Sequence, residues 1–206
     1  MNCRGHTTRV DIVSNYKVTP VAHIQLLTGQ TKHSDAGQII ENDYYIFTLV
    51  NKIKESDIQT ITCGIEAATD LLNLINHRGL HIFNPLVSIN SEQNIHNGSV
   101  LSNDSKKKNE TAIQLYNAIM WIITLIDAKT DTTIYNIKKE VEKYMNYEPY
   151  LSKIKSVNTI IKKCFKEKTL SNKINELRGA NNIRNSICNF SLLQEKLKNE
   201  NIPSYF

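Results

Sequence analysis

The spacing of hydrophobic residues changes twice within one segment, residues 57–81. Its first seven residues, DIQTITC, alternate between two faces and are rich in β-branched side chains, which predicts a strand. Residues 68–75 then place their apolar side chains at helical spacing, and Gly79 is positioned to end a helix. Residues 80–89 predict another strand, which Pro85 confines to an edge or a bulge. The segment therefore predicts strand–helix–strand.

The flanking segments extend this pattern. Residues 21–27, VAHIQLL, predict a strand, and residues 38–56 predict a helix because their apolar side chains fall close to helical spacing. Residues 118–128, AIMWIITLIDA, are apolar on both faces; a buried helix is an open alternative, but the many isoleucines favour a central strand. Right-handed crossovers would then place both helices on one face of a four-stranded sheet, in the order β-α-β-α-β-β.

The C-terminal part of the chain predicts helices. Ile134, Ile137, Val141 and Tyr144 fall at helical spacing, and the pattern repeats after Pro149. Shorter helices follow up to about residue 200. The predicted fold is α/β in the broad α+β sense, with a sheet domain over residues 8–130 and a helical extension over residues 131–206.

Charge divides the chain at nearly the same place. The net charge is +5 over 206 residues. Residues 1–127 contain ten Lys and Arg against twelve Asp and Glu, a balance of −2, and residues 128–206 contain fifteen against eight, a balance of +7. A basic segment of this kind favours a polyanionic partner.

Several classes of protein lack support in the sequence. There is no run of 18 apolar residues and no apolar N-terminal stretch, so we expect no membrane span and a cytoplasmic or nuclear location with reduced cysteines. His77 and His81 lie four apart without a third ligand, and the four cysteines match no zinc or redox spacing, so we expect no metal and no cofactor. No nucleophile–base pair or Gly-rich phosphate loop argues for an enzyme.

Three short matches, together with the predicted element order, resemble the Alba family of nucleic-acid-binding proteins. They are RVDI at Arg9–Ile12 before the first strand, GLH at Gly79–His81 entering the third, and IITL at Ile122–Leu125 in the fourth. The match is to the eukaryotic branch and covers about residues 8–130. It implies the same four-stranded fold and binding to DNA or RNA, with RNA preferred. It also implies a homodimer, or a heterodimer with another Alba-type chain. The clustered aromatic residues Tyr44, Tyr45 and Phe47 suit such an interface.

The resemblance also implies where nucleic acid binds. The family uses basic residues in the loop after the first strand and in a long hairpin, which contact phosphates and confer low sequence specificity. The corresponding positions are Gly29, Lys32 and His33 in the loop and Lys106, Lys107 and Lys108 in the hairpin. Solvated surface lysines are the simpler interpretation of both groups.

This chain departs from the family pattern in two respects. Glu66 and Asp70 stand where positive charge is expected, and the sheet domain balances at −2. A plain helical bundle is the simpler interpretation of the helical extension. The alternative is a supplementary basic face for nucleic acid, formed by Lys153, Lys155, Lys162, Lys163, Lys166 and Lys168. For the whole protein, the alternative to nucleic-acid binding is a protein-interaction module or a ribonucleoprotein subunit, as in the Alba-like subunits of ribonuclease P.

Overall fold

The computed structural model describes residues 1–87 and 107–206. In these residues the protein is a mixed α+β structure with a small antiparallel sheet and seven helices. The chain forms two compact units, the first made of residues 1–84 and 127–135 and the second of residues 85–126 and 136–206. The sequence placed residues 85–87 and 107–126 in the sheet domain, whereas in the structure these residues belong to the second unit.

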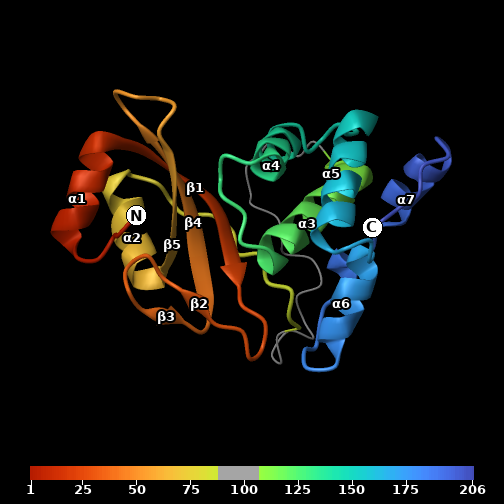
Figure 1. The fold of residues 1–206 in the computed structure, drawn as a ribbon, viewed down its shortest axis with the longest axis horizontal. Coiled ribbons are helices and arrows are strands. Elements are labelled where there is room, and N and C mark those ends of the chain that lie inside the picture. Colours follow the sequence, from red (N-terminus) through yellow and green to blue (C-terminus); the bar gives the residue numbers. More distant parts are fainter. Residues whose placement is uncertain (88–106) are drawn as a thin grey trace. The chain divides into compact units, whose positions relative to one another are not determined.

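The first unit is built on a three-stranded antiparallel sheet in the order β1-β4-β5 (Figure 1). Its elements are α1 (His6–Asn15), β1 (Tyr16–Gln25), β2 (Lys32–His33), β3 (Ile39–Ile40), β4 (Asp43–Asn51), β5 (Ile58–Gly64) and α2 (Ile65–Leu74). The central strand β4 pairs over its full length with β1, where the register shifts between Pro20 and Ala22. Proline has no N–H to donate, so this irregular edge position suits it.

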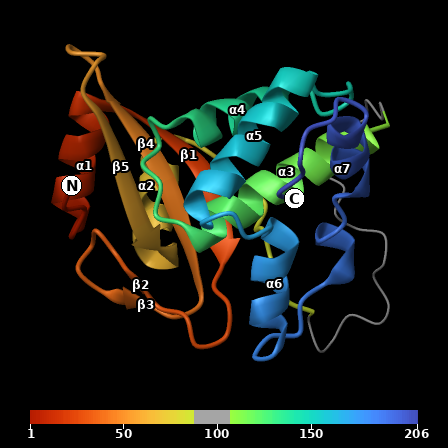
Figure 2. The same cartoon turned by 45° about the vertical axis from the view of Figure 1, so that its right-hand side comes forward.

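Helices α1 and α2 cover one face of this sheet (Figures 1 and 2). Ile12 of α1 and Leu71 of α2 belong to the same buried cluster as Tyr45, Phe47 and Leu49 of β4. The apolar stripe predicted for residues 68–75 therefore packs where its spacing indicated, and the strand predicted over residues 57–63 is confirmed as β5. The strand predicted over residues 21–27 is confirmed as the second half of β1.

The helix predicted over residues 38–56 is wrong, because Asp43–Asn51 form the central strand β4. Side chains on both faces of this strand are buried, so the period-2 alternation that marks a half-exposed strand is absent. The aromatic and β-branched run from Tyr44 to Val50 favours a strand and was the better signal.

The strand predicted over residues 118–128 is also wrong. Residues 118–125 belong to α3 (Glu110–Leu125), a helix with twelve buried residues. Asn109 caps its N-terminus, since its side chain accepts a hydrogen bond from the Ala112 N–H at 3.1 Å. Because α3 is buried on nearly all sides, its apolar residues do not form a single stripe. Its many isoleucines, which are common in strands, therefore favoured a strand over a helix.

The third predicted strand, over residues 80–89, forms only isolated bridges in its described part. Phe83 bridges Ile24 in parallel and Leu86 bridges Ile183, while residues 88 and 89 lie outside the described residues. With β4 in place of the first helix and α3 in place of the fourth strand, the predicted four-stranded β-α-β-α-β-β sheet is wrong.

The second unit is helical, as predicted for residues 131–200. It contains α3, most of α4 (Thr133–Lys143), α5 (Leu151–Cys164), α6 (Leu170–Arg178), the 3-10 helix η1 (Asn185–Ile187) and α7 (Ser191–Lys198). Helix α3 packs against α5, α7 and η1. Its Trp121 is fully buried and donates its indole N–H to the Ile187 carbonyl at 3.1 Å. Among the described residues, no helix is both long and apolar enough to cross a membrane.

Candidate functional site

The loop residues predicted to contact phosphate lie in the first unit. Gly29 occupies a turn at φ +77°, and Lys32 and His33 form the short strand β2. Lys32 is engaged inside its own unit: its Nζ lies 2.5 Å from the carboxylate of Asp127 and 4.7 Å from the centre of the Tyr44 ring. A lysine whose charge is already paired and whose side chain is 17% exposed is poorly placed to bind a phosphate.

The hairpin lysines fall at the edge of the described residues. Lys106 lies outside them, while Lys107 and Lys108 are exposed and precede α3. Lys107 and Lys108 lie in the second unit, whereas the loop residues lie in the first.

The proposed basic face of the extension is largely paired with carboxylates. Lys153 pairs with Glu140 at 2.6 Å and Lys155 with Glu200 at 3.0 Å. Lys162 lies 3.6 Å from Glu167, and Lys168 pairs with Glu176 at 2.8 Å. Lys163 and Lys166 are exposed, and neither forms an ion pair with a carboxylate of the described residues. The sequence predicted that these lysines form one basic surface. In the structure, most of them are paired with a neighbouring carboxylate.

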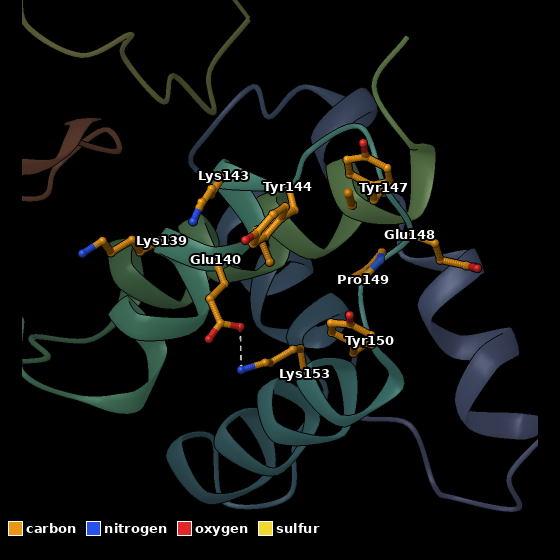
Figure 3. A pocket seen from close by; sticks show the side chains of 11 residues that line it. Lys139, Glu140, Lys143, Tyr144, Tyr147, Glu148, Pro149, Tyr150 and Lys153 are labelled. Carbon is orange, nitrogen blue, oxygen red and sulfur yellow. Dashed lines mark ion pairs between the residues drawn. The ribbon is translucent and has the colours of Figure 1, made fainter. Parts of the chain in front are cut away.

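A different arrangement is found in the second unit, where the end of α4 meets the start of α5. These segments enclose an open pocket of about 960 Å³, called here the tyrosine groove (Figure 3). It is lined by Ala112, Lys139, Glu140, Val141, Lys143, Tyr144, Tyr147, Glu148, Pro149, Tyr150 and Lys153. This volume is within the range of known small-molecule sites and accommodates planar rings.

Local backbone geometry explains why three tyrosines face solvent here. Helix α4 ends at Lys143, and the Tyr147 N–H donates to the Tyr144 carbonyl at 2.9 Å in the turn that follows. Pro149 precedes the start of α5, where Tyr150 is the N-cap residue. A turn and a proline therefore fill the short segment between the two helices. Tyr144, Tyr147 and Tyr150 are left 51%, 62% and 80% exposed.

The groove combines these rings with positive charge. Lys143 Nζ lies 5.0 Å from the centre of the Tyr144 ring, a cation–π contact, and no carboxylate of the described residues pairs with Lys139 or Lys143. The two carboxylates of the lining are themselves paired, Glu140 with Lys153 and Glu148 with Lys196. Figure 3 shows Lys153 reaching from α5 to Glu140 on α4. Two lysines are therefore left to meet an anion beside three exposed rings.

The side chains of the groove are suited to contact with planar rings and with anions. Its lining contains no His, Cys, Ser or Thr side chain. Nowhere in the described residues do three or more His, Cys, Asp or Glu side chains gather so as to hold a metal ion. Exposed tyrosine rings stack on planar groups, and free lysines bind phosphates or carboxylates.

Sequence reasoning missed this groove, although its signal is present. The stretch YMNYEPY at residues 144–150 carries three tyrosines in seven residues around a proline. The sequence pattern places Tyr144 in the apolar stripe of a helix, but in the structure that stripe ends at Val141, which is 5% exposed. Aromatic residues interleaved with lysines are typical of single-stranded nucleic-acid surfaces, and that was the available clue.

Comparisons with protein-family models, with curated proteins and with solved structures found no match. The family resemblance drawn from the sequence is therefore not supported by any relative.

Proposed function

We propose that the protein is a non-enzymatic binding protein for single-stranded nucleic acid, RNA in the first place, with low sequence specificity, and that the tyrosine groove is its binding site. The observation that carries the proposal is the presence, in one groove, of three exposed tyrosines and of two lysines that no carboxylate of the described residues pairs with. Bases stack on aromatic rings regardless of their identity, and lysines contact the backbone, so such a surface binds without reading sequence.

The charge of the second unit supports this proposal. Its residues contain seventeen Lys and Arg against ten Asp and Glu, a balance of +7. A positive field of this size attracts a polyanion from a distance and makes binding dependent on ionic strength.

The proposed function is the one that the Alba resemblance implied, but the proposed binding site is the tyrosine groove. The resemblance placed the contacts at Lys32 and at the hairpin lysines, but Lys32 is already paired with Asp127. The implied dimer stays a prediction, but the residues suggested for its interface are buried. Tyr44, Tyr45 and Phe47, whose aromatic surface suggested an interface, lie inside the first unit at 0%, 6% and 0% exposure.

The stacking part of the proposal is tested by fluorescence anisotropy with a labelled oligouridylate. Tyr150→Ala should weaken binding by roughly tenfold, because one base loses its stacking partner. Tyr150→Phe keeps the ring and should bind as the wild type does. At 80% exposure Tyr150 contributes little to the core, so both variants should fold.

The phosphate part is tested by the salt dependence of the same titration. Replacing Lys139 and Lys143 by Ala should lower the slope of log K against log salt by about 0.7 for each phosphate that is no longer neutralised. Lys163→Ala, an exposed lysine of the same unit outside the groove, is the matched control and should leave the slope unchanged. An affinity that depends on Lys163 and not on Lys139 or Lys143 would place the site on the basic face of α5. Absence of binding to any single strand would leave a protein-interaction module as the better interpretation.

A further inference from the structure

Two cysteines far apart in the sequence meet in the core of the first unit. Cys3 precedes α1 and Cys63 lies in β5, and both are fully buried in the same cluster. Their thiols lie close enough for each to shift the pKa of the other. Both cysteines are free, so one core holds the two thiols that a disulfide requires.

The backbone holds both cysteines through Asp35. The Cys3 N–H donates to the Asp35 carbonyl at 3.0 Å. Asp35 also joins the strand that carries Cys63: its N–H donates to the Thr62 carbonyl, and its carboxylate accepts from the Thr62 N–H, both at 2.8 Å. The two segments are therefore tied to a common residue immediately beside the thiols, so their approach is a fixed feature of the fold.

The two thiols differ in their chemistry. The hydrogen bond from Cys63 lowers the pKa of the Cys3 thiol, and the positive charge of Arg9 acts in the same direction, outweighing the effect of burial. The same hydrogen bond, together with burial, raises the pKa of Cys63. Arg9 is held close, because its Nη1 donates to the Cys3 carbonyl at 3.0 Å. Cys3 is thus the nucleophile of the pair.

The segment that carries Cys3 provides access. Its neighbours Asn2, Arg4 and Gly5 are exposed, and Gly5 adopts φ +83°, which only glycine adopts readily. Local opening of this segment would cost less than global unfolding and would uncover the Cys3 sulfur.

We propose that Cys3 and Cys63 form a reversible intramolecular disulfide and that this pair is a redox modification site. The oxidant is a low-molecular-weight disulfide of the glutathione class. The Cys3 thiolate attacks one sulfur of that disulfide, forms a mixed disulfide and releases one glutathione thiolate, which takes up a proton. The Cys63 thiolate then attacks the Cys3 sulfur and releases the second glutathione. Two protein thiols are oxidised to one disulfide, and one glutathione disulfide is reduced to two thiols.

The product ties the start of α1 to strand β5. The bond closes a loop of about 60 residues that contains β1 and β4, so it restricts the unfolded chain over most of the first unit. Oxidation should therefore stabilise this unit against unfolding without altering the tyrosine groove, whose lining residues all belong to the second unit.

The test uses the full chain with Cys164→Ser and Cys188→Ser, so that only the proposed pair remains. The protein is equilibrated in a buffer rich in oxidised glutathione, then examined by thiol titration, intact mass and peptide mapping. We expect both thiols to disappear with the loss of two hydrogen atoms and no glutathione adduct. We also expect a peptide that joins Cys3 to Cys63, and a melting temperature that rises by roughly 5 °C or more. Reduction should reverse all of these.

A variant that also carries Cys63→Ala is the matched control. It should accumulate a stable glutathione adduct on Cys3, because no second thiol resolves it. The equilibration is repeated in urea below the unfolding transition, where the segment before α1 opens more often. Thiols that stay free in both conditions would overturn the proposal. A disulfide that lowers the melting temperature would overturn it as well, since the native geometry would then not accommodate the bond.

Discussion

At the scale of single residues, Asp70 shows how one side chain joins two helices of the first unit. It lies in α2 and accepts hydrogen bonds from two residues of α1, His6 at 3.0 Å and the Nε of Arg9. Burial by itself would raise the pKa of Asp70, but the hydrogen bonds from Arg9 and His6 outweigh burial and hold the pKa below its ordinary value. The acidic residue that stood against the family pattern is therefore explained by packing within the unit.

This lowered pKa predicts how stability depends on pH. A carboxyl group whose pKa is lower in the folded state contributes stability that is fully present above its unfolded pKa of about 3.9 and is lost as pH falls through the folded value. Asp70→Asn should therefore lower the free energy of unfolding by about 1 kcal/mol at neutral pH. The difference from the wild type should shrink below about pH 4, as measured by urea titrations across that range. Glu66→Gln, an exposed change in the same helix, is the control; a difference that persists unchanged in acid would contradict the role of the Asp70 charge.

At the scale of elements, the two glycines that follow helices α2 and α6 play different parts. Gly79 adopts φ +87°, and a Cβ atom there would lie 2.9 Å from the hydroxyl of Tyr45. That hydroxyl accepts from the Leu80 N–H and donates to the Leu80 carbonyl, both at 3.2 Å. Gly179, the C-cap of α6, has right-handed helical angles and open space around its Cα.

These environments predict opposite outcomes for the same substitution. Gly79→Ala should destabilise the protein by about 1–3 kcal/mol, because alanine is strained at positive φ and its methyl group displaces Tyr45. Gly179→Ala should be neutral or stabilising by up to about 1 kcal/mol, since it reduces the freedom of the unfolded chain without a clash. Chemical denaturation of the two variants side by side provides the comparison. Equal effects would show that the Gly79 turn is not held by the Tyr45 hydroxyl.

At the scale of the whole molecule, charge is divided between the two units. The first contains eight Lys and Arg against ten Asp and Glu, a balance of −2, while the second balances at +7. A similar division of charge is present along the sequence, and in the structure it falls between the two compact units. A polyanion is attracted by the second unit and repelled by the first, within a Debye length of about 8 Å at physiological ionic strength.

This division predicts that the first unit contributes little to nucleic-acid affinity. Lys32→Ala should leave both the affinity for oligouridylate and its salt slope unchanged, because the charge of Lys32 is already paired with Asp127. The Lys139 and Lys143 variants, measured in the same titration, supply the positive comparison. A clear loss of affinity in Lys32→Ala would return the binding site to the loop after β1.

Much of the local structure follows from the sequence alone. Strand β5, the second half of β1, helix α2 and the helices after residue 131 each keep one exposed face, so the hydrophobic period survives in the sequence and predicts the element. The aromatic stretch at residues 144–150 and the excess of lysine in the second half are also properties of the sequence, and they supply the components of the proposed site.

Tertiary structure alone decided the rest, for two physical reasons. Strand β4 and helix α3 are buried on nearly all sides. Hydrophobic residues therefore occur all around each element, and their spacing does not distinguish a strand from a helix. The availability of each lysine depends on which carboxylate lies beside it: within the described part of the chain Lys32 and Lys155 are paired, whereas Lys139 and Lys143 are not. Likewise, Cys3 and Cys63 lie 60 residues apart in the chain, and only the packing of the N-terminal segment against β5 brings their thiols together.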